Sequence, residues 1–171
     1  PIRVDAATAF GTGHHGTTRG CLEALDRVIN AGLASAPVLD LGCGTGILGI
    51  AAAKAMRVRV VGSDIDPIAV AKARENVRVN GVAAHMRTYE SKGLDAVAVR
   101  RHGPVGLVLA NILARPLERL APLIAAHRSP GAPVILSGLL REQEPQVIAA
   151  YRRTGLFLRA RIHHDEWSTL I

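Results

Sequence analysis

The stretch LDLGCGTGILGIAAAKA, residues 39–55, limits the possible folds of this chain more than any other. A short apolar run that contains Asp40 is followed by glycines at positions 42, 44, 46 and 49, and then by a helix-forming segment. A glycine-rich turn between a buried strand and a helix lets the backbone approach a bound nucleotide closely. The stretch therefore predicts an open α/β sheet with a nucleotide-type ligand at the end of its first strand.

The hydrophobic pattern alternates between strands and helices along the chain. Strands are predicted at 37–41, 58–64, 84–89, 105–111 and 132–138, with two more joined by a turn at 163–166, and helices at 17–31, 46–56, 67–79, 113–126 and 142–153. Asp66 is expected to cap the third helix, with Pro67 at its first position. Residues 91–104 form a loose, charged connection. This order predicts a mostly parallel sheet with helices on both faces and a C-terminal antiparallel hairpin.

Length and composition narrow the class of protein. At 171 residues one domain is expected, and no apolar run approaches the roughly 20 residues that cross a bilayer, so no membrane partner is expected. Two cysteines fit a reducing cytoplasm rather than a disulfide framework. The net charge of +7 comes mostly from scattered arginines, and aromatic residues make up 3%, so no direct nucleic-acid partner is expected. Because the chain begins at Pro1, we expect it to be part of a longer protein.

The acid at position 40 bears on whether the ligand is a dinucleotide or a cationic nucleoside. Gly44, Gly46 and Gly49 satisfy the dinucleotide fingerprint, and Asp64 follows at roughly the right distance to hold a ribose. A carboxylate so close to the glycines would repel a pyrophosphate, but it suits the cationic sulfonium of S-adenosylmethionine (SAM). Asp40 therefore favours SAM as the cofactor. Two alternatives stay open: Asp40 as a loop-capping carboxylate, and a nicotinamide-binding oxidoreductase.

Two further strand ends supply candidate ligand contacts. Asp64, at the end of the second strand, is expected to bind both ribose hydroxyls, and Ile65 is expected to lie against the adenine. Asn111 ends the fourth strand, where its side-chain carbonyl can accept a hydrogen bond from a substrate amine. The alternative for Asn111 is that it caps the next helix.

The residues resemble one known family over nearly the whole chain. The segments that carry the resemblance are AFGTGHHGTT (9–18), LDLGCGTGILGIAA (39–52), GSDIDPIAVAKARENVRVNG (62–81), LVLANILARPLERLAP (107–122) and ILSGLL (135–140). Together they are similar to the PrmA-type methyltransferases, which methylate ribosomal protein eleven of the large subunit. The FGTGHH element and NILA are the most specific of these motifs, because the glycine loop is shared by a wider superfamily.

The resemblance implies a seven-stranded, Rossmann-like class I SAM-dependent methyltransferase fold. It implies that residues 1–171 form the SAM-binding domain, with a leading loop and helix at 1–35 and an α/β core at 36–171. A separate N-terminal domain would recognise the ribosomal protein. The resemblance also implies that Thr18, Gly42, Asp64 and Asn111 contact SAM or border it.

The NILA ending indicates the type of acceptor. Relatives that methylate a planar base or amide usually carry an aromatic residue where this chain has Ala114, so a flexible lysine ε-amine or an N-terminal α-amine is the expected acceptor. Asn111 would orient that amine, with no metal and no obligatory general base. Phe10 and the Gly11–Gly13 hinge are expected to close over the cofactor. Trp167 is expected to pack within the terminal hairpin.

Two other functions remain possible on this pattern. One is a methyltransferase of the same kind with another protein target, such as a lysine of a flavoprotein. The other is a module that binds SAM without catalysing transfer.

Overall fold

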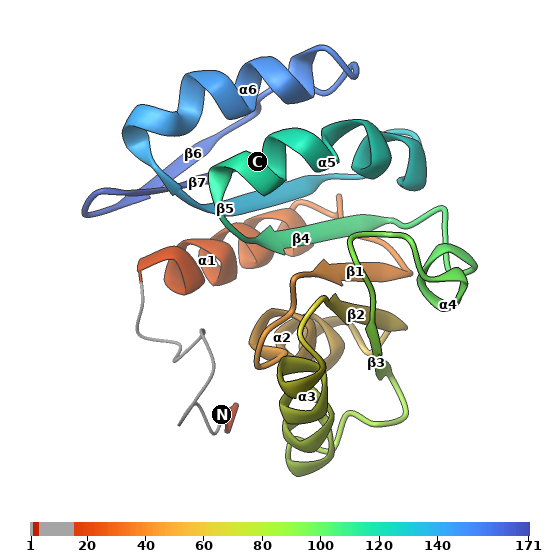
Figure 1. The fold of residues 1–171 in the computed structure, drawn as a ribbon. Coiled ribbons are helices and arrows are strands. Elements are labelled where there is room, and N and C mark those ends of the chain that lie inside the picture. The colour runs from red at the N-terminus through yellow and green to blue at the C-terminus, as the bar shows by residue number, and fades with distance from the viewer. Residues whose placement is uncertain (1, 4–15) are drawn as a thin grey trace.

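The computed structural model describes residues 2–3 and 16–171, and these residues contain a seven-stranded sheet in the order β3-β2-β1-β4-β5-β7-β6 (Figure 1). The strands are β1 (Val38–Leu41), β2 (Val60–Asp64), β3 (Met86–Glu90), β4 (Leu107–Asn111), β5 (Val134–Leu140), β6 (Arg161–His164) and β7 (Trp167–Leu170). The helices are α1 (Gly16–Asn30), α2 (Ile47–Met56), α3 (Pro67–Val79), α4 (Val97–Arg100), α5 (Ala114–His127) and α6 (Glu144–Arg152), with a 3-10 turn, η1 (Arg141–Gln143), before α6.

The strand order reverses between β1 and β4. Strands β1 to β5 pair in parallel, and β7 pairs antiparallel with both β5 and β6. After β3 the chain returns to lie beside β1, so the loops that follow β1 and β4 leave the sheet at neighbouring positions. In open α/β sheets this reversal creates the crevice in which ligands bind. The predicted fold class, including the antiparallel hairpin, is confirmed.

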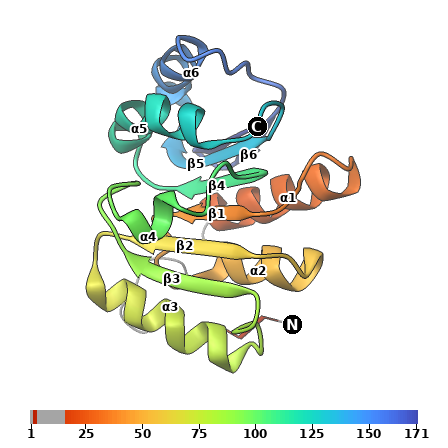
Figure 2. The same ribbon diagram turned by 90° about the vertical axis from the view of Figure 1, so that its right-hand side faces the viewer.

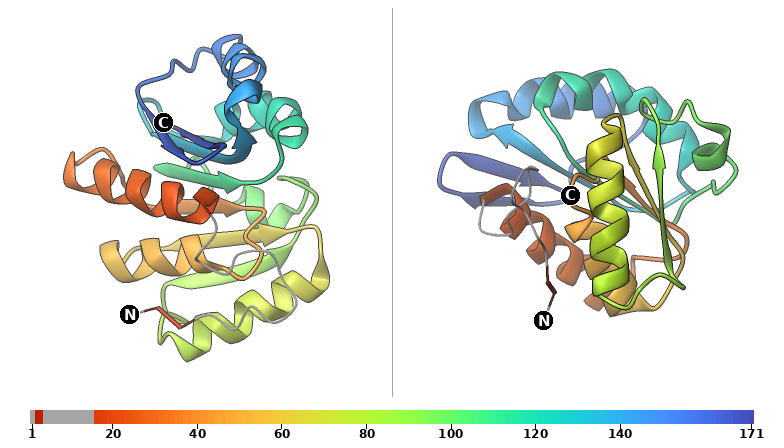
Figure 3. Two further views of the ribbon diagram at one scale, coloured as in Figure 1. Left: turned by 90° about the vertical axis from the view of Figure 1, so that its left-hand side faces the viewer. Right: turned by 60° about the horizontal axis from the view of Figure 1, so that its bottom comes forward.

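Helices cover both faces of the sheet. Helices α1, α2 and α3 pack on one face, where Leu25, Ile50 and Met86 belong to one apolar cluster, and α4, α5 and α6 pack on the other, where Leu117 and Leu139 belong to a second. Figure 2 and the left view of Figure 3 show α1 and α2 on the side of the sheet opposite α5 and α6. All residues of β1 are buried, as expected for a strand covered on both sides.

Local signals place helix α3 where the sequence predicts it. The Asp66 side chain accepts a hydrogen bond from the Ile68 backbone N–H at 2.9 Å, and Pro67 is the first helical residue. The Asp66 carboxylate pairs one of the free N–H groups of the first turn, and Pro67 has no N–H group that would need a partner. The helix ends before Gly81, which has a φ of +69°. The predicted cap and start of this helix are confirmed.

The structure differs from the predicted elements in three places. The connection at 91–104 contains the short helix α4, and the helix predicted from residue 142 begins with η1. In the terminal hairpin the turn is shorter than expected, since His163 and His164 belong to β6. None of the helices in the described part of the chain is both long and apolar enough to span a bilayer.

Candidate functional site

The glycine loop turns sharply at the carboxyl end of β1. Gly42 has a φ of +67°, a conformation that side chains with a Cβ rarely adopt. A Cβ at Gly42 would also collide with the Cγ2 atom of Ile112, the residue that follows β4. Because both constraints apply, only glycine fits at the first position of the loop.

Asp40 lies beneath this loop rather than on its surface. Its side chain is 1% exposed, and its Oδ2 atom accepts a hydrogen bond from the Gly49 backbone N–H in the first turn of α2 at 2.8 Å. Burial raises the pKa of the Asp40 carboxyl to about 7, although the bond from Gly49 acts in the opposite direction. This contact is the one expected of a loop-capping carboxylate. The role of Asp40 beside a sulfonium stays a prediction.

Asp64 joins the end of β2 to the glycine loop. Its Oδ2 atom accepts a hydrogen bond from the Gly44 backbone N–H at 2.8 Å, and its Oδ1 atom accepts one from the Asp66 backbone N–H at 3.0 Å. The carboxylate is half-buried, and the next residue, Ile65, is 65% exposed. An acid and an apolar side chain therefore border the loop on the β2 side, as a nucleoside site requires.

Asn111 stands at the same edge of the sheet, at the end of β4. It pairs in register with Ser137 of β5 and is half-buried. Helix α5 begins three residues later, and its N-cap position is Leu113, with no side-chain capping bond. Asn111 therefore does not cap this helix, and the structure contradicts that alternative.

Ile112 links the two halves of this edge, a role that the sequence analysis missed. Its side chain lies where a Cβ of Gly42 would be, and its backbone lies against Gly138 of β5. Gly138 has a φ of +85°, and a Cβ there would be 2.8 Å from the Ile112 carbonyl carbon. The pairing between β5 and β7 shifts register around Gly138. The sequence carried little signal for this bulge, because Gly138 stood at the end of the predicted strand 132–138, where a glycine ordinarily marks a turn.

A pocket of about 390 Å³ lies at the start of α5, where the segment that follows Asn111 forms part of its wall, although Asn111 does not line it. Its walls include Leu113 and Ala114 at the start of α5, Leu140 at the end of β5, Gln143 of η1 and Trp167 of β7. The Gln143 side chain is fixed by accepting a hydrogen bond from the Leu140 backbone N–H at 2.9 Å. Trp167 thus contributes to a pocket wall as well as to the hairpin.

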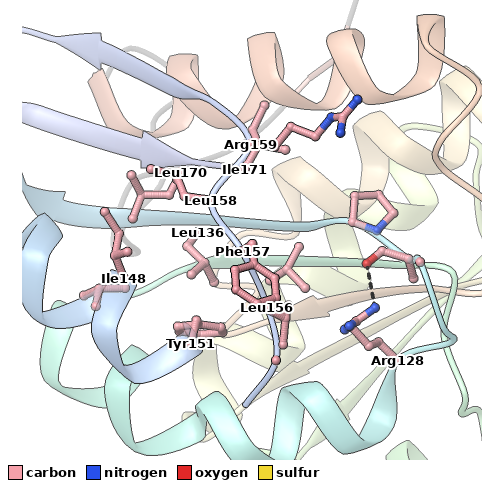
Figure 4. A pocket seen from close by; sticks show the side chains of 16 residues that line it. Arg128, Leu136, Ile148, Tyr151, Leu156, Phe157, Leu158, Arg159, Leu170 and Ile171 are labelled. Carbon is pink, nitrogen blue, oxygen red and sulfur yellow. Dashed lines mark hydrogen bonds between the residues drawn. The ribbon is translucent and has the colours of Figure 1, made fainter. Parts of the chain in front are cut away.

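A second pocket, of about 280 Å³, lies away from this edge (Figure 4). It is lined by Leu136, Tyr151, Leu156 and Phe157, between α6 and the amino-terminal half of β5. None of the predicted site residues in the described part of the chain lines it. The candidate site is therefore the edge formed by the glycine loop, Asp64 and Asn111.

The remaining predicted cofactor contacts are Thr18 and the segment that precedes it in the chain. Thr18 is buried in the first turn of α1, one turn before Cys21. The Cys21 thiol interacts with Ser137 of β5 and with the charge of Asp40, so this face of α1 is turned toward the candidate edge. Phe10 and Gly11–Gly13 lie outside the described residues.

Among the described residues no group of three His, Cys, Asp or Glu side chains is placed to hold a metal ion.

Comparison with known proteins identifies the family. The family model described as "Ribosomal protein L11 methyltransferase (PrmA)" matches residues 1–171. The chain belongs to this family. Curated PrmA relatives include the ribosomal protein L11 methyltransferases of Bradyrhizobium diazoefficiens, 55% identical, and of Rhodopseudomonas palustris strain BisB5, 52% identical, each matched over 99% of this chain. The chain spans 57% of the length of each of these two relatives.

Solved structures agree with this placement. The ribosomal protein L11 methylase of Lactobacillus delbrueckii subsp. bulgaricus is 30% identical and superposes with a TM-score of 0.85, over 99% of this chain and 82% of that one. An RNA methyltransferase of Salinibacter ruber, solved with S-adenosyl-L-homocysteine, is 25% identical and has a TM-score of 0.66, over 86% of this chain and 88% of that one. The PrmA chain described here thus has the fold of the class I SAM-dependent methyltransferases.

Proposed function

We propose that this chain is the catalytic part of a SAM-dependent protein N-methyltransferase whose substrate is the large-subunit ribosomal protein L11. The observation that carries the proposal is the convergence of the glycine loop, Asp64 and Asn111 at one edge of the sheet. Membership of the PrmA family and the names of the relatives support the substrate. Methylation of a ribosomal protein would place the protein in the cytoplasm.

The described residues fit SAM. Gly42 adopts the positive φ that the tight turn of the loop requires, Asp64 presents a half-buried carboxylate for the ribose hydroxyls, and the exposed Ile65 offers an apolar surface for the adenine. Gly44 and Gly46 complete the loop, and the bond between Asp40 of β1 and Gly49 of α2 joins the two elements that flank it. When bound, SAM supplies a methyl group activated by its positive sulfur.

Asn111 would receive the acceptor amine, and the pocket lined by the segment that follows it would receive the rest of the side chain. The Asn111 carbonyl can accept a hydrogen bond from an amine N–H without adding charge, and so orient the nitrogen lone pair. The adjoining walls at Leu113, Ala114 and Leu140 are aliphatic and suit the carbon chain of a lysine. Positioning of this kind supplies much of the rate enhancement of a displacement reaction.

The test combines ligand binding with methyl transfer. Calorimetry of the purified chain with SAM and with NAD separates this proposal from a nicotinamide enzyme, because we expect binding of SAM alone. Mass spectrometry of purified L11 treated with the complete protein and SAM should show added methyl groups on amines. NAD binding without SAM binding would contradict the proposal. Transfer to another protein, such as a flavoprotein, but not to L11 would contradict the assigned substrate.

Substitution of Asn111 tests the site itself. We expect Asn111→Ala in the complete protein to lower turnover about 100-fold while changing SAM affinity only a few-fold, because the amide acts on the acceptor. The matched control is Asn30→Ala, since Asn30 is exposed at the end of α1 and its side chain donates a hydrogen bond to Asp26, one turn earlier in the same helix. Equal turnover of the two variants would remove Asn111 from the acceptor site.

A further inference from the structure

The pocket between α6 and the amino-terminal half of β5 combines an apolar wall with positive charge. Its volume is about 280 Å³, and its apolar lining includes Leu136, Ile148, Leu156, Leu158 and Leu170. Among the described residues that line it, the polar side chains are those of Arg128, Tyr151 and Arg159, and none is an acid. A largely apolar cavity with a few convergent polar groups is the general form of a small-molecule site.

The two arginines lie on the same side of this pocket. Figure 4 shows Arg128 and Arg159 on one side of the cavity and Ile148 and Tyr151 on the other. Within the described part of the chain, no acid forms an ion pair with either arginine. One end of the pocket is therefore positively charged, and the rest of it is mostly apolar.

The positions of both arginines are fixed by hydrogen bonds. The Nη1 atom of Arg128 donates to the backbone carbonyls of Ser129 and Ala132, at 3.1 and 3.2 Å. Its Nε atom is buried and has no hydrogen-bond partner among the described residues. The backbone N–H of Arg159 donates to the Ile171 carbonyl at 2.7 Å. Because a guanidinium carries five N–H donors, the bonds at Nη1 of Arg128 leave further donors for a ligand.

Tyr151 adds a third donor to the lining. It is 5% exposed, and its hydroxyl has no hydrogen-bond partner among the residues that the structure describes. Burial raises the pKa of Tyr151, so the hydroxyl stays protonated. The polar groups of the lining thus offer donors and positive charge but no negative charge. Such a lining matches a ligand that is apolar over most of its length and anionic at one end.

We propose that this pocket binds a small amphipathic carboxylate, with its apolar chain or ring between α6 and β5 and its carboxylate at Arg128 and Arg159. Guanidinium groups pair with carboxylates through parallel N–H donors, and these charge-assisted bonds are stronger than bonds between neutral groups. The site is separate from the methyl-transfer site, because none of the described residues assigned to SAM or to the acceptor lines it. Binding here is therefore independent of the proposed function.

The experiment titrates the purified chain with four probes that vary the head group and the apolar chain separately. The probes are octanoate, octanol, octylammonium and acetate, and NMR shifts of the backbone amides report both affinity and location. With about ten non-hydrogen atoms, octanoate should bind with a Kd of about 1 mM or lower. We expect octanol to bind about 10-fold more weakly, because it cannot pair with the arginines. Octylammonium and acetate should not bind measurably.

The location of the shifts is part of the result. Octanoate should shift the amides of residues 132–136 and 156–159, which line the pocket, and leave those of the glycine loop unchanged. Calorimetry with SAM, in the presence and absence of octanoate, should give the same SAM affinity.

Substitutions test the two ends of the pocket. Arg128→Gln should weaken octanoate binding about 10-fold, and Arg159→Gln about 3-fold because Arg159 is exposed. Both should leave octanol binding unchanged. The matched control is Arg153→Gln, since Arg153 is also exposed but does not line the pocket. Ile148→Trp fills the apolar part and should abolish binding of octanoate and octanol alike. Thermal melting and SAM affinity check that each variant is folded.

Four outcomes would overturn the inference. Equal affinities for octanoate and octanol would show that the arginines do not select an anion. Absence of octanoate shifts up to about 10 mM would show that the pocket is not a site for this class of ligand. Shifts confined to the glycine loop would place binding elsewhere, and equal losses in Arg153→Gln and Arg159→Gln would indicate an effect of overall charge.

Discussion

Asp64 and Asp66 are separated by one residue and hold different parts of the molecule. Asp64 bonds to the glycine loop, whereas Asp66 bonds to the first turn of α3. We expect Asp64→Ala to weaken SAM binding roughly 10- to 100-fold, because hydrogen bonds to a charged group are worth about 1.5–3 kcal/mol. Asp66→Ala should keep SAM affinity and lower the free energy of unfolding by about 1 kcal/mol, as for loss of a helix cap. Calorimetry and urea unfolding measure the two effects, and equal affinities would contradict the ribose assignment.

The pH dependence of stability tests the burial of Asp40. Its pKa is raised from 3.8 to about 7 by burial, so the folded state binds more protons than the unfolded state between these values. The contribution of Asp40 to stability therefore falls as pH rises from about 4 to about 7. Asp40→Asn removes this dependence, and its stability relative to wild type should increase between pH 5 and pH 7.5 in urea unfolding.

The control for this experiment is Asp26→Asn, because Asp26 is exposed on α1. Its stability relative to wild type should stay constant over the same interval. Parallel curves for Asp40→Asn and wild type would show that the Asp40 carboxyl is not perturbed. SAM affinity of Asp40→Asn then tests the remaining hypothesis, since direct contact with the sulfonium requires the charge and fixing of the loop does not.

At the scale of elements, the bulge in β5 determines how closely the segment after β4 can approach. We expect Gly138→Ala to lower the free energy of unfolding by about 2–4 kcal/mol, because the substitution combines a disfavoured φ with a collision against Ile112. Gly155→Ala separates these causes, since Gly155 has a φ of +82° but no atom within 4 Å of its Cβ position. This control should cost about 1 kcal/mol. Equal losses in urea unfolding would show that the contact with Ile112 is unimportant.

The elements that could be predicted from sequence are those set by local signals. The start of α3 followed from Asp66 and Pro67, which act within the first turn of the helix. Helix α4 could not be predicted, because four residues are too few to show a helical period. The bulge at Gly138 was missed because its cause is Ile112, a residue 26 positions earlier in the sequence.

The candidate site divides in the same way. Asp64, Gly42 and Asn111 were predictable because each stands at the end of a strand, and parallel strands end at a common edge. The pocket wall was not predictable, because it joins Trp167 and Gln143 to Leu113 through pairing in the C-terminal hairpin. The sequence left two roles open for Asp40, loop capping and contact with the sulfonium. The hydrogen bond from the Gly49 backbone N–H, which supports the capping role, is visible only in the structure.

For the whole molecule, the edge that binds the cofactor and the surface that binds the protein substrate are expected to be separable. The described residues assigned to SAM lie between Thr18 and Asn111, whereas the chain spans 57% of the length of its curated relatives. We expect this chain alone to bind SAM with near-normal affinity but to methylate L11 far more slowly than the complete protein does. Contacts remote from the reacting atoms supply the binding energy that positions a substrate.

A methyl-transfer assay of the chain and the complete protein, at saturating SAM and on the same L11, makes the comparison. Comparable rates would place substrate recognition within residues 1–171. The connection at 91–104 and the terminal hairpin would then be the first surfaces to examine.

The position of Ile112 between Gly42 and Gly138 also restricts how such an enzyme can be re-engineered or can diverge. A bulkier residue at 112 would displace the loop at Gly42, and any shift of the 112 backbone would press on Gly138, so the NILA tetrapeptide cannot be replaced without changes in both segments. Changes at positions 113–116, which line the pocket, do not involve the side chain that packs against Gly42. Residues 113–116 can therefore diverge while the contact between Ile112 and the glycine loop is kept.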